Sequence, residues 1–153
     1  MRVGDTLKKE RERKAISTQD MAAKLGISEQ QYQQLEEGNS PAEKWGPALA
    51  QIAIKLQTPV ARLISETGKS AQVIRGRCGE IIKRHREKRG VSIEHMATSV
   101  GLPREEYEEM ERAASSIEEF GPLLLRFAEQ IEQPMFNLFY PCGLPLEKLE
   151  DYP

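Results

Sequence analysis

A short polar stretch, Glu29-Gln-Gln-Tyr-Gln-Gln, carries the side chains of this chain that are best suited to specific hydrogen bonding. Gln30 and Gln34 are four positions apart, so on a helix they lie on one side, one turn from each other. A glutamine amide both donates and accepts, and this pair of functions matches N6 and N7 of adenine in the DNA major groove. Glutamines are also good helix formers on a solvated surface, so the residues alone leave both interpretations open.

Nothing comparable points to catalysis or to metal binding. His85 and His95 are isolated, and Cys78 and Cys142 stand 64 positions apart without a CxxC partner. We expect two reduced thiols, one of them in a core, with a disulfide or a redox sensor as the alternative. Because no phosphate loop and no pair of nucleophile and base stands out, we predict no enzyme, no metal and no cofactor.

Composition limits where the chain works and what it binds. Hydrophobic residues make up 39% and charged residues 30% of 153 positions, which is typical of a soluble globular protein without a membrane span. The start, Met1-Arg-Val-Gly-Asp, has no apolar signal region, so we expect a cytoplasmic location. A net charge of −2 excludes a general basic coat, and any binding of nucleic acid must therefore be local.

The sequence contains a long internal repeat. Shifting the chain by 75 positions aligns residues 4–68 with residues 79–143 without a gap, and 19 of the 65 pairs are identical. Solenoid repeats run only about 20 to 50 residues, so we interpret this period as a duplicated domain. The expected organisation is a first domain at 1–68, a linker or helix extension at 69–77, a second domain at 78–143 and a tail at 144–153.

Each copy is predicted to be all-α, with five short helices. Apolar spacing and stop signals place those of copy one at 4–14, 18–25, 29–37, 43–56 and 60–66. Ser17 and Ser28 precede helices as N-caps, and Gly26 supplies the positive φ that ends the second helix. In copy two, helical spacing of apolar residues allows the first helix to begin as early as Ser70.

Ala22, Gly26 and Tyr32 satisfy the steric needs of two helices that cross at a steep angle, and copy two repeats them. The stretch Ser17-Thr-Gln-Asp-Met-Ala-Ala-Lys-Leu-Gly-Ile-Ser with Leu35-Glu-Glu-Gly resembles the lambdoid phage repressors and Cro proteins of the XRE-type helix-turn-helix family. The resemblance covers nearly all of both copies and implies two tandem lambda-repressor-like domains. Tyr32 stands where a branched aliphatic residue is commoner, which predicts a wider crossing with a hydroxyl at its edge.

The resemblance also assigns roles to individual residues. Base reading by the third helix of copy one is assigned to Glu29, Gln30, Gln31, Gln33 and Gln34. Phosphate contact is assigned to Ser17, Thr18, Asn39, Ser40 and Lys44. Two structural ion pairs, Arg11 with Glu36 and Arg86 with Glu111, are expected to join the first and third helices of each copy.

Copy two has the same scaffold residues and a different surface. Its third helix carries Glu105, Glu106, Glu108 and Glu109 where DNA would lie. Each carboxylate near a phosphate would cost on the order of 1 kcal/mol even in a water-like dielectric. We therefore expect that this helix does not read DNA.

The closing segment of copy two gains three aromatic residues, Phe136, Phe139 and Tyr140, relative to copy one. They predict either a homodimer or protein interface, or packing within the core and between the copies. Two functions follow as hypotheses. The first is a transcription regulator that binds double-stranded DNA through copy one. The second is a protein-interaction adaptor or co-regulator in which neither copy touches DNA.

Overall fold

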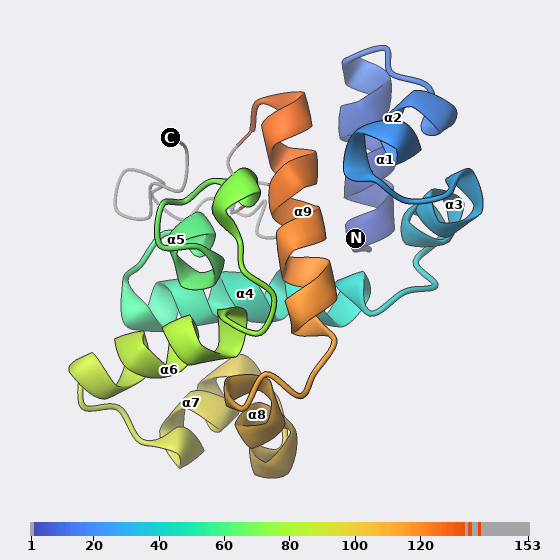
Figure 1. Cartoon of the computed structure of the whole chain (residues 1–153). Helices are drawn as coiled ribbons and strands as arrows, with labels where there is room; N and C mark the ends of the chain where they lie inside the picture. Colours follow the sequence, from blue (N-terminus) through green and yellow to red (C-terminus); the bar gives the residue numbers. More distant parts are fainter. Residues whose placement is uncertain (1, 134, 136–137, 139–153) are drawn as a thin grey trace.

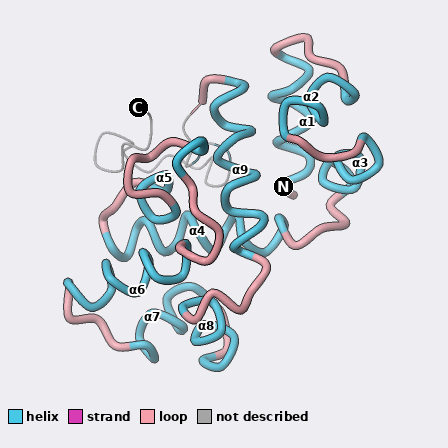
Figure 2. Tube along the Cα trace, in the orientation of Figure 1, coloured by secondary structure: helices cyan, strands magenta, loops and turns pink. Residues whose placement is uncertain are grey.

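The computed structural model describes residues 2–133, 135 and 138. Helices and loops account for all of these residues, so the all-α prediction is confirmed for the described part (Figures 1 and 2). Copy one forms α1 (Val3–Arg13), α2 (Thr18–Leu25), α3 (Glu29–Glu37), α4 (Ala42–Leu56) and α5 (Val60–Ile64). A 3₁₀ turn, η1 (Ser70–Gln72), precedes α6 (Cys78–Lys88), α7 (Ile93–Val100), α8 (Arg104–Glu111) and α9 (Ile117–Ile131). None of the helices described is both long and apolar enough to cross a membrane.

The turn signals of the helix-turn-helix segment act as predicted. The Ser17 hydroxyl accepts a hydrogen bond from the Asp20 amide at 3.0 Å, and Ser28 forms a capping box with Gln31. These bonds satisfy backbone donors that a helix start leaves unpaired. Gly26 ends α2 at φ 73°, a left-handed conformation that glycine adopts without steric cost.

Of the two alternatives for residues 69–77, a linker or an extension of the first helix of copy two, the structure shows a linker. Ser70 starts only the single turn η1, and α6 begins eight residues later at Cys78. Gly76 between them has φ 88°, which interrupts any continuous α-helix. Two hydrogen bonds from Ser70 to the Glu129 carboxylate, the backbone one at 2.9 Å, fix this connection against α9 instead.

The fourth helices of the two copies are exchanged. α2 of copy one packs against α9 of copy two, and α7 of copy two packs against α4 of copy one. The helices α4 and α9 also pack on each other near the centre of the molecule (Figure 1). In addition, α5 of copy one packs on α6 of copy two. Each helix-turn-helix segment is thus supported by a helix that comes from the other copy.

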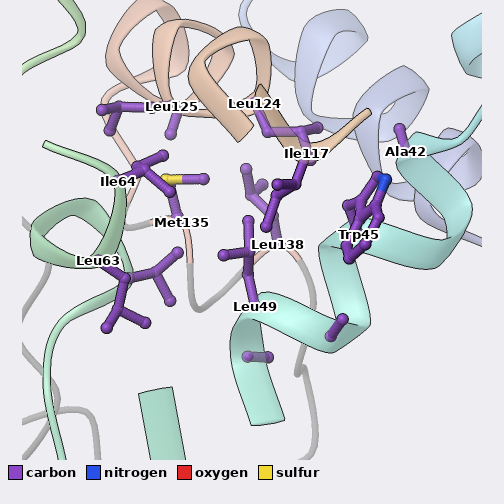
Figure 3. Packing of buried hydrophobic residues seen from close by; sticks show 14 of the residues in the cluster. Ala42, Trp45, Leu49, Leu63, Ile64, Ile117, Leu124, Leu125, Met135 and Leu138 are labelled. Atoms are coloured by element: carbon purple, nitrogen blue, oxygen red, sulfur yellow. The ribbon is translucent and has the colours of Figure 1, made fainter. Parts of the chain in front are cut away.

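One continuous core results from this exchange. Trp45 and Leu49 of α4 are fully buried together with Ile64 of α5 and Ile117 and Leu124 of α9 (Figure 3). The indole Nε1 of Trp45 donates to the Ser116 hydroxyl at 2.7 Å, a bond between residues 71 positions apart. The apolar contacts that hold copy one therefore also hold copy two.

Two glycines allow the first and third helices of each copy to touch. A Cβ atom on Gly4 would lie 2.4 Å from the Leu35 carbonyl oxygen, and one on Gly79 would lie 2.0 Å from that of Met110. Both distances are far below van der Waals contact. The backbone of α3 is thereby brought directly against α1, and that of α8 directly against α6.

Candidate nucleic-acid interface

A buried ion pair holds α3 in place. Arg11 on α1 binds the Glu36 carboxylate through both Nε and Nη2, at 2.6 and 3.1 Å. Its Nη1 donates to the Ile16 carbonyl at 2.8 Å, so the guanidinium also fixes the loop before α2. A bidentate pair of this kind sets orientation as well as distance. The ion pair with Arg11 on α1 therefore fixes the orientation of α3.

Copy two reproduces this arrangement almost atom for atom. Arg86 binds Glu111 at 2.7 and 3.1 Å and donates to the Val91 carbonyl at 2.8 Å. The structure thus brings together both ion pairs that the sequence suggested. They lie beneath the two third helices, and their geometry gives no reason to assign them a role in binding.

Tyr32 lies on the inner side of α3 rather than at the edge of the helix crossing. The whole residue is buried, and its hydroxyl oxygen lies beside the ion pair of Arg11 and Glu36. Burial, and then the Glu36 carboxylate, raise the pKa of the Tyr32 hydroxyl above its ordinary value. The hydroxyl that was expected at the edge of the crossing is therefore buried beside the ion pair instead.

Two of the five candidate base-reading residues are available to a ligand. Gln30 and Gln34 are exposed, and neither amide has a hydrogen-bond partner within the described residues. Gln31 is occupied, since its side-chain oxygen accepts from the Ser28 amide at 3.0 Å. Glu29 accepts from the Thr18 hydroxyl at 3.2 Å and from the Gln33 amide at 3.5 Å. The exposed surface of α3 that remains free is thus the pair Gln30 and Gln34.

The candidate phosphate contacts are mostly engaged within the protein. The Ser40 hydroxyl accepts from the Ala42 amide at 3.2 Å and so caps α4, while the Asn39 amide donates to Glu37 at 3.4 Å. Lys44 contacts the Glu106 carboxylate of α8 and lies 4.7 Å from the centre of the Trp45 ring. Ser17 and Thr18 have the bonds described above, and both lie at the start of α2.

Two glutamates that the sequence analysis did not single out shape this region. Glu43 accepts from the amides of Val3 and Gly4 at 3.0 and 2.8 Å, so it caps α1. Glu118 in copy two does the same for α6, with bonds of 2.9 to 3.1 Å that include the Cys78 amide. Glu43 and Glu118 are identical residues at matching positions of the repeat, and this identity in the sequence could have pointed to a shared role.

The third helix of copy two presents carboxylates that are partly neutralised. Arg104 pairs with Glu108 at 2.8 Å and also contacts Glu94 of α7. Glu106 pairs with Lys44, whereas Glu105 is exposed and has no partner in the part of the chain that is described. Two of the four glutamates predicted to face away from the core are therefore paired with cations, Glu106 and Glu108.

The predicted interface residues Phe136, Phe139 and Tyr140 lie outside the described residues. Among residues that are described, no group of three or more His, Cys, Asp and Glu could hold a metal ion. Cys78 is a buried free thiol, and burial, followed by Glu118, raises its pKa. This environment makes it an inert core residue.

Three comparisons with known proteins were made for this chain. No protein-family model, no curated protein and no solved structure matches it.

Proposed function

We propose that this chain is a sequence-specific DNA-binding transcription regulator that reads the major groove through α3. The proposal includes two lambda-repressor-like helix-turn-helix units, each completed by the fourth helix of the other copy. The observation that carries it is the pair Gln30 and Gln34, exposed and without hydrogen-bond partners among the described residues on one side of a firmly held helix. A bidentate glutamine contact to adenine contributes about 1–3 kcal/mol of discrimination.

The rigidity of α3 supports this role. The capping box fixes its start, Gly38 ends it at φ 79°, and Tyr32 and Leu35 bury its inner side. Base reading requires side chains whose positions are set by a rigid element, because an error of one ångström loses the hydrogen bond. A buried inner side and a buried ion pair also hold α8 in copy two, so the rigidity of α3 is a requirement for base reading that the scaffold meets, and the glutamine pair is what distinguishes α3.

Copy two supports the helix-turn-helix segment of copy one that is proposed to read DNA. α9 packs against α2, and the Arg126 guanidinium approaches the Leu25 carbonyl at the end of α2 at 3.5 Å. The start of α2, with Ser17 and the amides of its first turn, is thereby held for contact with a phosphate. Two protomers bound together would place two α3 helices in half-sites about 34 Å apart.

The second candidate function is a protein-interaction module without DNA binding. The pairing of Lys44 with Glu106 favours it, since this bond removes a cation from the expected phosphate contacts. With few phosphates neutralised, the affinity for DNA and its dependence on salt concentration would both be modest.

Selection from a random duplex library at low salt, followed by binding measurements on the enriched site, tests the proposal. The Gln30→Ala/Gln34→Ala variant should lose the enriched site but keep weak non-specific binding. The Glu105→Ala/Glu109→Ala variant is the matched control on α8 and should keep it. If no site is enriched, or if the glutamine variant binds the enriched site as tightly as the parent chain, the regulator function is wrong.

A further inference from the structure

A large open pocket lies where copy one meets copy two, away from α3. It has a volume of about 1030 Å³ and is lined by the connection into α5, by the turn after α5 and by the second half of α6. In Figure 1, α9 stands between this region and α1 to α3. Pockets for small ligands measure about 300–1,000 Å³, so the size suits a molecule such as a nucleotide.

The wall of this pocket is strongly basic. Its charged residues are four permanent cations and one carboxylate, a formal charge of +3, in a chain whose net charge is −2. These residues are Arg62, Lys69, Arg84, Arg89 and the carboxylate Glu66, and His85 lies among them. A concave surface lined by charges of one sign concentrates the field and attracts a counter-ion.

Most of this positive charge is not neutralised within the protein. Glu66 pairs with Arg84 at 2.7 Å. Arg62 and Arg89 each reach a backbone carbonyl at 3.3 Å, and Arg89 also lies 3.5 Å from the Nδ1 atom of His85, so neither is paired with a carboxylate. Lys69 is exposed and its ammonium group has no partner among the residues described. The field is felt at His85, whose pKa is lowered by burial and then by Arg89, Lys88 and Arg84.

The repeat shows which of these charges are particular to this place. Copy one has Lys9 and Lys14 at the positions that match Arg84 and Arg89, so those two positions are basic in both copies. Copy two has Asn137 at the position that matches Arg62. Arg62, which adds its charge to those of Arg84 and Arg89, is therefore specific to the junction of α5 with α6.

The uncharged residues that line the pocket suit a ligand that has a neutral part as well as a charged one. Ile81 and Ala61 are buried beneath the pocket, and Pro59 and Thr67 contribute a mixed rim. An anion with two or more adjacent negative charges would satisfy the arginines, because guanidinium groups bind phosphate oxygens in a fixed fork. We propose that this pocket binds a small phosphorylated ligand that carries at least two negative charges.

Titration calorimetry on the full chain at low salt tests the site, with inorganic pyrophosphate and adenosine diphosphate as probes. Both should bind with one molecule per chain, whereas inorganic phosphate should bind at least tenfold more weakly. The Arg62→Gln/Arg89→Gln variant should weaken pyrophosphate binding at least tenfold. The matched control is Lys83→Gln, an exposed residue of α6 that is outside the pocket lining, and it should leave the affinity unchanged.

Two further measurements, the pyrophosphate affinity of a Glu66 variant and the pKa of His85, should change in directions that only binding in this pocket explains. Glu66→Gln removes the single carboxylate and should tighten pyrophosphate binding about threefold. Saturation with pyrophosphate should raise the pKa of His85 in an NMR titration, because an anion would replace repulsion from Arg89 by attraction. Should the double arginine variant unfold, Glu66→Gln and Lys69→Gln carry the test.

Three outcomes overturn the proposal. One is the absence of binding heat with either probe, and another is equal affinity in the parent chain and the pocket variants. The third is loss of duplex binding in the arginine variant while pyrophosphate gives no heat, which would assign the cations to a DNA backbone. Because no arm requires the Gln30 and Gln34 surface, failure of the regulator function leaves the test of this site intact.

Discussion

The ammonium group of Lys44 on α4 contacts the Glu106 carboxylate on α8, so a cation of copy one is paired with the third helix of copy two. Lys44 also lies over the Trp45 ring, which restricts its reach further. Lys44, one of the candidate phosphate contacts, is thus paired with a residue 62 positions away in the sequence. Within the proposed regulator, this contact acts as an internal competitor for a phosphate group.

Replacing Glu106 by Gln should therefore strengthen DNA binding. Exposed ion pairs contribute about 0.2–1 kcal/mol, so we expect a gain of about threefold in affinity for the enriched duplex. Fluorescence anisotropy measures it. The gain should vanish when Lys44→Gln is added, and a gain that persists in the double variant would mean that general repulsion by Glu106, not its hold on Lys44, limits binding.

The close approach of α6 to α8 makes Gly79 sensitive to the smallest substitution. In Gly79→Ala the new Cβ would meet the Met110 carbonyl oxygen at 2.0 Å, and neither atom can move away without a shift of the helix backbone. Overpacking of this kind costs about 3 kcal/mol or more. Urea denaturation followed by circular dichroism gives the free energy of unfolding.

Gly121→Ala is the matched control for Gly79→Ala. Gly121 lies inside α9, where an added Cβ would meet Ile64 at 3.4 Å, an ordinary contact. Alanine is favoured over glycine in a helix interior by up to about 1 kcal/mol. The variant should be as stable as the parent chain or more stable, and a loss equal to that of Gly79→Ala would show that any change in the core is harmful.

The ion pair of Arg86 and Glu111 should be costly to break from one side. Both side chains are at least nine-tenths buried, so Arg86→Met leaves a carboxylate without its partner at a cost of about 3–5 kcal/mol. The double variant Arg86→Met/Glu111→Leu should be more stable than this single variant, since no charge is left buried. Strictly additive losses in a double-mutant cycle would contradict this account.

The environment of His85 predicts a dependence of stability on pH. Its folded-state pKa lies below the ordinary 6.5, with burial as the main cause and Arg89 as the next. Below pH 6.5 the unfolded chain then binds more protons than the folded chain, so stability falls as the pH is lowered through this region. His85→Gln should flatten the change in melting temperature between pH 7 and pH 5, and His95→Gln on the exposed surface of α7 is the control.

The sequence predicted the helix caps and turns well because these depend on residues that are close together in the chain. The serine caps and Gly26 act through hydrogen bonds and dihedral angles within four residues, and the repeat doubled each signal. For residues 69–77 the sequence left a linker and a helix extension open, and positive φ at Gly76 excludes the helix extension despite the apolar spacing around it. The ion pair of Arg11 with Glu36 was suggested by family resemblance, and the structure brings these residues together.

The exchange of helices could not be read from the sequence. A buried face on α4 has the same apolar spacing whether it covers α2 or α7, so the pattern does not name its partner. The occupied state of Gln31 and Ser40 was equally hidden, because a polar residue at a helix start can serve a ligand or a cap. Only Gln30 and Gln34 were both predicted and found free within the described part of the chain.

Trp45 provides a probe for the shared core. It is the single tryptophan of the chain, it is fully buried, and it touches Ser116 of copy two. Its fluorescence and the circular dichroism signal should change together in a single urea-induced unfolding transition. Gly79→Ala, a change in copy two, should shift the Trp45 transition by the same amount as the dichroism, and two separate transitions would show that the copies unfold independently.

The packing of α4 and α9 across the two copies also bears on how the sequences of the two repeats could diverge. A chain of two separate domains could lose one of them with little harm to the other. Here α9 covers α2, so damage to the core of copy two would remove the support beneath the helix that carries Gln30 and Gln34. Exposed residues of α8 such as Glu105, which has no partner in the part of the chain that is described, are under less restraint, and several of the acidic side chains of copy two lie on this helix. Because the two cores interlock, substitutions in the interior of one copy affect the other copy, whereas exposed positions can change more freely.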